Sequence, residues 1–82
     1  MEVRRGQIMR SLAGHDKGDF QTVIKLEGEF AYMTDGKRRK LEAPKKKKLK
    51  HLAPTGTQLS EASLSTNRQI RMALAEYREH TT

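Results

Sequence analysis

Short apolar segments separated by glycine and proline dominate the first two-thirds of this 82-residue sequence. The longest uninterrupted apolar runs in the chain have four residues, at 30–33 and 72–75. Brief apolar or alternating runs between turn-forming residues are typical of β-strands. We therefore expect a small antiparallel barrel or sandwich in which neighbouring segments pair. The five predicted strands are residues 7–12, 20–26, 30–33, 38–42 and 49–52.

The connections between these segments have recognisable sequences. Residues 14–18 carry two glycines with charged residues between them, which indicates a loop. Asp35 followed by Gly36 is a strong hairpin signal, because glycine adopts positive φ freely and aspartate tolerates it. The lysine run after Pro44 is expected to be a mobile loop, and Pro54 is expected to end the barrel.

The last third of the chain has a different pattern. Residues rich in serine, threonine, glycine and glutamine predict a linker, and Thr66 and Gln69 then have the spacing of a helix capping box. Four apolar residues follow at helical spacing, so one helix face is expected to dock on the barrel or on a partner: Ile70, Ala73, Leu74 and Tyr77. The predicted organisation is a barrel at 1–54, a linker at 55–65 and a helix at 66–80.

Positive charge is concentrated in one segment. The whole chain has 17 lysines and arginines against 10 acidic residues, a formal net charge of +7. Residues 37–50 alone carry +8, and the remainder of the chain sums to −1. A local excess of this size favours a polyanionic partner such as a nucleic acid or an anionic membrane surface.

Several other classes of protein are disfavoured. A chain this short buries a modest core, so we expect no enzyme, no small-molecule substrate and no cofactor. The absence of cysteine excludes disulfides and thiolate zinc sites, and His15, His51 and His80 lack metal-ligand spacing, so no metal is expected. The longest apolar run is too short for a membrane span, and we expect a cytoplasmic protein without a membrane partner.

The loop at 14–18 and its flanks resemble the KOW motif of ribosomal proteins and transcription-elongation factors. The matching residues are Gly14, Asp16, Lys17 and Gly18, between apolar runs at 8–9 and 23–24. The sequence departs from the motif at Gln21, where a further glycine is usual.

The resemblance extends over residues 3–55. The basic segment at 35–42, the lysine run and the Lys-His-Leu-x-Pro-Thr sequence at 50–55 are similar to those of a small family of bacterial KOW-domain RNA-binding proteins. That family is itself similar to an archaeal and eukaryotic large-subunit ribosomal protein family. The resemblance implies a mainly β fold: a five-stranded SH3-like barrel, followed here by a linker and a short C-terminal helix. It also implies binding of ribosomal RNA or the large ribosomal subunit.

The candidate RNA-binding residues come from the loop and from the basic segment. Leu41 is expected to face inward, so Arg38 and Lys40 would face solvent and be the stronger phosphate contacts. Few aromatic residues are available and Phe30 is expected in the core, so we expect recognition of the RNA backbone and shape. The candidates are Gly14, His15, Lys17, Gly18, Lys37, Arg38, Arg39, Lys40, Lys45, Lys46, Lys47, Lys48 and Lys50.

Three other interpretations are open at this stage. The chain can be a protein-interaction module of the transcription or translation machinery that docks through its barrel or its C-terminal helix. It can be an RNA chaperone without a fixed site. The lysine run can also be only a solvated loop, since runs of like charge are often unstructured.

Overall fold

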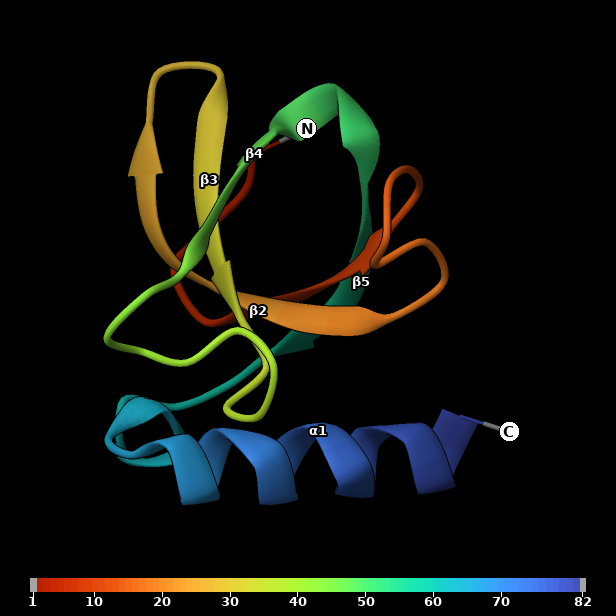
Figure 1. Ribbon diagram of the computed structural model, residues 1–82. Helices are drawn as coiled ribbons and strands as arrows, with labels where there is room; N and C mark the ends of the chain where they lie inside the picture. Colours follow the sequence, from red (N-terminus) through yellow and green to blue (C-terminus); the bar gives the residue numbers. More distant parts are fainter. Residues whose placement is uncertain (1, 82) are drawn as a thin grey trace.

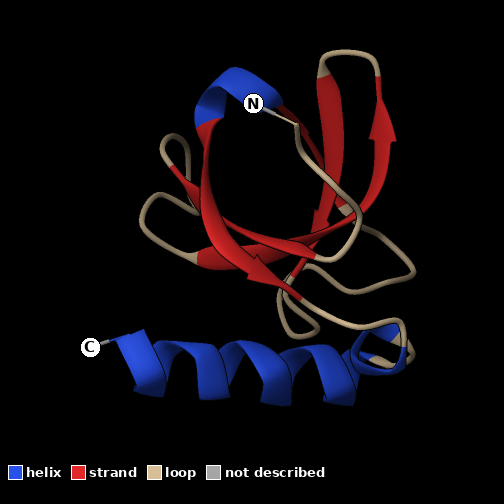
Figure 2. Cartoon of the chain, turned by 180° about the vertical axis from the view of Figure 1, so that it is seen from behind, coloured by secondary structure: helices blue, strands red, loops and turns tan. Residues whose placement is uncertain are grey.

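The computed structural model describes residues 2–81, and these form five β-strands, two short 3₁₀ turns and one α-helix (Figure 1). The sheet is antiparallel with strand order β4-β3-β2-β1-β5, and it curls into a barrel-like body with the helix lying along one side (Figures 1 and 2). The predicted small β domain with a C-terminal helix is confirmed. The elements are β1 (Gln7–Ser11), β2 (Phe20–Glu27), β3 (Phe30–Thr34), β4 (Lys45–Lys48), η1 (Leu49–His51), β5 (Leu52–Gln58), η2 (Ala62–Leu64) and α1 (Asn67–Thr81).

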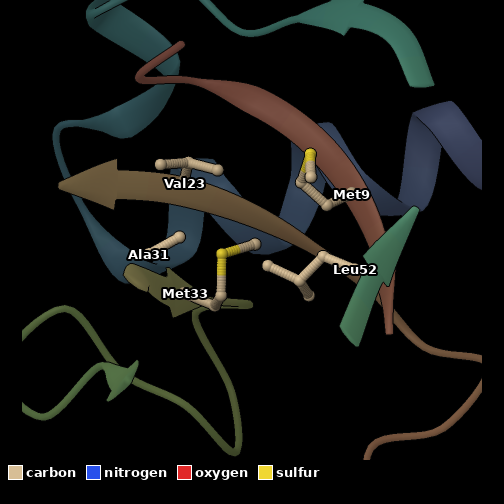
Figure 3. Packing of buried hydrophobic residues seen from close by; sticks show 5 residues of the cluster. All are labelled: Met9, Val23, Ala31, Met33 and Leu52. Carbon is tan, nitrogen blue, oxygen red and sulfur yellow. The ribbon is translucent and has the colours of Figure 1, made fainter. Parts of the chain in front are cut away.

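Two apolar cores lie on opposite faces of the sheet. Neighbouring residues of a strand point to opposite faces, and both Ile8 and Met9 of β1 are fully buried. Met9 belongs to the cluster inside the barrel (Figure 3), whose other buried members are Val23, Ala31, Met33 and Leu52. Ile8 belongs to the cluster beneath the helix, whose other buried members are Leu64, Ile70 and Leu74.

The helix α1 docks on the barrel through the predicted apolar stripe. Ile70 and Leu74 are buried, and the ring of Tyr77 meets that of Phe20 edge-on with centroids 5.2 Å apart. At the N-terminus, the Gln69 N–H donates to Oγ1 of Thr66 at 3.1 Å, which supplies the expected N-cap. Packing against the sheet explains why so short a helix is stable.

The strand predicted at 38–42 is wrong. Residues 35–44 form turns instead, because the Asp35 carboxylate accepts hydrogen bonds from the N–H groups of Lys37 and Arg39, both at 2.9 Å. These bonds close an Asx-type turn and remove backbone donors that a strand would use. Leu41, expected inside the barrel, lies half-buried against the cluster beneath the helix.

The loop predicted for the lysine run is also wrong, because Lys45–Lys48 forms β4. Its backbone pairs with β3 in a regular antiparallel register, from Met33 opposite Lys45 to Phe30 opposite Lys48. Lysine has a low intrinsic strand preference, and the exposed edge of β3 overrides it. An edge strand made entirely of lysine also discourages pairing with another chain.

The last strand lies further along the chain than predicted. The predicted strand at 49–52 begins as the 3₁₀ turn η1, and β5 then runs through Pro54 to Gln58, beyond the expected barrel end. Pro54 has no backbone N–H to donate. It is tolerated because β5 is an edge strand, so the outer edge of its backbone pairs with no other strand. The predicted linker therefore contributes to β5, and its later part contains η2 with the buried Leu64.

The turn region at 35–44 is fastened to the start of α1. The Leu41 N–H donates to Oδ1 of Asn67 at 2.8 Å, and Nδ2 of Asn67 donates to Oε1 of Glu42 at 2.6 Å. Gly36 lies against the same helix turn with φ +76°, and a Cβ there would come within 2.2 Å of the Asn67 carbonyl oxygen. This fastening fixes the turn that carries Arg39.

Candidate nucleic-acid interface

A shallow hollow of about 460 Å³ joins the two segments that the sequence singled out separately. One wall is the loop between β1 and β2, and the other is the edge strand β4 with the turn η1; the loop and β4 lie on different sides of the barrel in Figure 1. The lining residues are Ala13, Gly14, His15, Asp16, Phe30, Arg39, Lys45, Lys46, Lys47, Lys48 and His51.

A buried carboxylate links the two walls of this hollow. Asp16 is only 3% exposed, and its Oδ2 lies 3.1 Å from Nζ of Lys47 and 3.2 Å from Nε of Arg39. Lys47 also donates to Oγ of Ser11 at 2.7 Å. The loop after β1, the turn after β3 and strand β4 therefore meet at one anion.

The surroundings of Asp16 favour its ionised form. Burial alone raises the pKa of Asp16, but hydrogen bonds from Lys47 and Arg39 outweigh it, and the pKa falls to about 2. The buried amide of Gln21 also lowers the pKa of Asp16. Within residues 2–81, neither the nitrogen nor the oxygen of this amide makes a hydrogen bond of ordinary length. Asp16 is therefore a fixed negative charge at neutral pH.

The cations of the hollow fall into two groups with different roles. Lys47 is 9% exposed at its side chain, and both Lys47 and Arg39 are engaged with Asp16, so they hold the walls together. Lys45, Lys46 and Lys48 are exposed along the edge strand. These three ammonium groups are the ones available to an anionic ligand.

The loop at 14–18 is folded back onto β1. The Gly18 N–H donates to the Ser11 carbonyl at 2.8 Å, and the Lys17 N–H donates to the Gly14 carbonyl at 3.2 Å. Gly14 is exposed with φ +78° and has open space where a Cβ would stand, so its backbone is accessible from the hollow. The loop thereby presents His15 as an exposed side chain beside the lysines.

The hollow brings together only part of the predicted site. The members that line it are Gly14, His15, Arg39, Lys45, Lys46, Lys47 and Lys48. Lys17 and Gly18 belong to the same loop but not to the lining, and Lys50 lines a separate hollow of about 310 Å³ beside Gly28 and Glu29. The remaining three are Lys37, Arg38 and Lys40, which lie on the turn region at 35–44; Arg38 and Lys40 are exposed as expected.

Sequence reasoning missed three features of this site. The first is the ion-paired role of Asp16, and the second is the lining position of His51. The third is Phe30, which was expected in the core but is half-buried and lines the hollow. Period-two alternation along β4 would have predicted that Lys47 faces differently from Lys46 and Lys48.

A comparison with protein-family models finds no match to this sequence, and a comparison with curated proteins finds none either. Among the described residues, no helix has the length and apolar character needed to cross a membrane.

Proposed function

We propose that this chain is a non-enzymatic RNA-binding protein of the KOW type that holds the RNA backbone in the hollow between β4 and the loop at 14–18. One observation carries the proposal: three exposed lysines of one strand share a concave surface with an accessible glycine backbone and an exposed histidine. Phosphate groups suit this surface, since they accept hydrogen bonds from lysine ammonium groups and from backbone N–H groups.

The electrostatics of the site support a polyanion over a small anion. β4 places a lysine at each of its four positions, so Lys46 and Lys48 on one face and Lys45 on the other present several exposed ammonium groups along the same strand. Each phosphate that a lysine neutralises releases condensed counterions, which makes binding favourable at low salt and weak at high salt. The Asp16 cluster keeps the two walls of the hollow in place before RNA arrives.

We propose that the bound RNA is ribosomal RNA of the large subunit and that binding takes place in the cytoplasm. The support is the resemblance of residues 3–55 to bacterial KOW-domain proteins, together with the small barrel-like β fold. The rival hypothesis is docking of a protein through the barrel or the C-terminal helix, and its helix part is less favoured. Ile70 and Leu74 of the helix's apolar stripe are already covered by the barrel.

The test is RNA binding as a function of salt, using a variant with Lys45, Lys46 and Lys48 each replaced by glutamine. The log–log slope of affinity against salt should become shallower by about 2, because each phosphate contact on a single strand contributes about −0.7. Affinity at low salt should fall at the same time.

A matched control removes three charges elsewhere. Arg68, Arg71 and Arg78 are exposed on α1, away from β4 (Figure 1), and their replacement by glutamine changes the net charge by the same amount. Equal losses in the two variants would show that only overall charge matters and would overturn the proposed site. Failure of the natural protein to bind any RNA would overturn the function itself.

A further inference from the structure

Two aromatic rings of β3 point away from the barrel interior. Ala31 and Met33 are fully buried inside the barrel, so the alternate residues Phe30 and Tyr32 face outward. Both rings are half-buried rather than enclosed. In the sheet their neighbours on β4 are lysines, with Phe30 opposite Lys48 and Tyr32 opposite Lys46.

Ammonium groups occupy the faces of these rings. Nζ of Lys46 lies 4.5 Å from the centroid of Phe30 and 5.9 Å from that of Tyr32. Nζ of Lys25 lies 5.4 Å from the centroid of Tyr32. Glu27 holds both cations loosely, at 3.9 Å from Lys46 and 3.7 Å from Lys25. We call the group formed by Phe30, Tyr32, Lys46, Lys25 and Glu27 the ring patch.

The two lysines of the ring patch are easily displaced from the aromatic faces. The side chains of Lys46, Lys25 and Glu27 are 47%, 65% and 53% exposed, and ion pairs at such exposure contribute little. Each ammonium can swing on its long side chain and leave an aromatic face open. A ligand with both a flat ring and an adjacent negative charge would replace the existing contacts with stronger ones.

We propose that the ring patch is a stacking site for unpaired nucleobases, and that Lys46 and Lys25 move from the rings to the neighbouring phosphates when a base enters. This inference rests on the proposed function and narrows it to single-stranded or looped RNA. Every nucleobase has a flat face that can stack on an aromatic side chain, whereas paired bases in a duplex are not accessible for it.

The ring patch and the hollow are continuous. Phe30 and Lys46 belong to both, so one strand can place phosphates along β4 while its bases turn toward β3. With two rings, the ring patch accommodates few bases and needs no particular sequence. This arrangement gives a preference for unpaired RNA that backbone contacts alone would not give.

Tyrosine fluorescence tests the stacking directly. The chain has no tryptophan and two tyrosines, so replacing Tyr77 with phenylalanine leaves Tyr32 as the sole tyrosine reporter. Titration with a short oligouridylate should quench Tyr32 emission in parallel with binding measured by anisotropy of labelled RNA. Binding that saturates without any change in Tyr32 emission would overturn the inference.

Affinity measurements on ring variants give the second test. Phe30→Leu and Tyr32→Leu should each weaken oligouridylate binding about five- to a hundredfold, while binding of a blunt-ended RNA duplex and the salt slope stay unchanged. Phe30→Tyr and Tyr32→Phe keep a stacking face and should retain affinity, which separates loss of stacking from loss of folding.

The outcomes distinguish this inference from the proposed function. If the natural protein binds neither the oligouridylate nor the duplex, both ideas fail. If it binds both RNAs equally and the leucine variants change nothing, RNA binding stands and the stacking site is wrong.

Discussion

At the scale of single residues, Asp16 determines which cations form ion pairs within the protein. Its carboxylate engages Lys47 and Arg39, two of the basic residues in the segment that gives the chain its positive charge. A cation that is held this way stabilises the fold and is less available to a phosphate. The exposed Lys45, Lys46 and Lys48 therefore carry most of the proposed interaction with RNA.

Replacing Asp16 with asparagine should destabilise the protein by about 2 kcal/mol at neutral pH, because the poorly exposed Lys47 loses its counter-ion. The pKa of Asp16 is lowered to about 2 from an ordinary value of 3.8, so its contribution is complete above about pH 4 and is lost as the pH falls toward 2. Urea unfolding of both proteins at neutral pH and near pH 3 measures this. A stability difference that does not shrink at the lower pH would contradict the role given to Asp16.

At the scale of elements, the connection between the turn region at 35–44 and α1 depends on close backbone approach. Gly36 has positive φ and touches the carbonyl of Asn67, and Asn67 in turn bonds the backbone of Leu41. This contact orients the turn that delivers Arg39 to Asp16. The helix, far from the hollow in sequence, thus helps to position Arg39, which lines the hollow.

Gly36→Ala should cost clearly more than the roughly 1–2 kcal/mol of placing a residue with a Cβ in the left-handed region, because the added carbon also collides with backbone. Gly28→Ala is the matched control: Gly28 also has positive φ, but its Cβ would meet open space. Chemical denaturation of the two variants gives the difference. Equal losses would mean that the close approach to Asn67 contributes nothing.

At the scale of the whole molecule, the proposed binding region and the two apolar cores occupy different parts of the sheet. The barrel interior and the cluster beneath α1 are buried on its two faces, and the lysines and outward rings gather around β3 and β4. Covering one face with the helix removes an apolar surface that would otherwise attract partners. The exposed edge strand β4 is strongly basic.

Leu74→Ala should therefore reduce the free energy of unfolding by about 2–5 kcal/mol, since it leaves a cavity in the cluster beneath the helix. RNA affinity should not change under conditions in which the variant is folded. Met72→Ala, on the exposed side of the same helix, should change stability by less than about 0.5 kcal/mol. Loss of RNA affinity in a folded Leu74→Ala protein would place the helix in the interface.

The sequence by itself determined the features that depend on neighbouring residues. Strands β1, β2 and β3 follow from short apolar runs between glycine turns, and α1 follows from its Thr66 cap and the spacing of its buried residues. The concentration of positive charge at 37–50 is also a property of the sequence alone. Each of these signals acts over a few residues, so no knowledge of the fold is needed to see it.

Only the tertiary structure decided what depends on a distant partner. Lys45–Lys48 becomes a strand because the edge of β3 is free to pair with it, and the N–H of Leu41 donates to the distant Asn67 instead of to a neighbouring strand. Asp16 and Lys47 are 31 positions apart, and no local pattern predicts their ion pair. The outward position of Phe30 likewise follows from the register of β3 in the sheet, because pairing, not propensity, fixes which face a side chain takes.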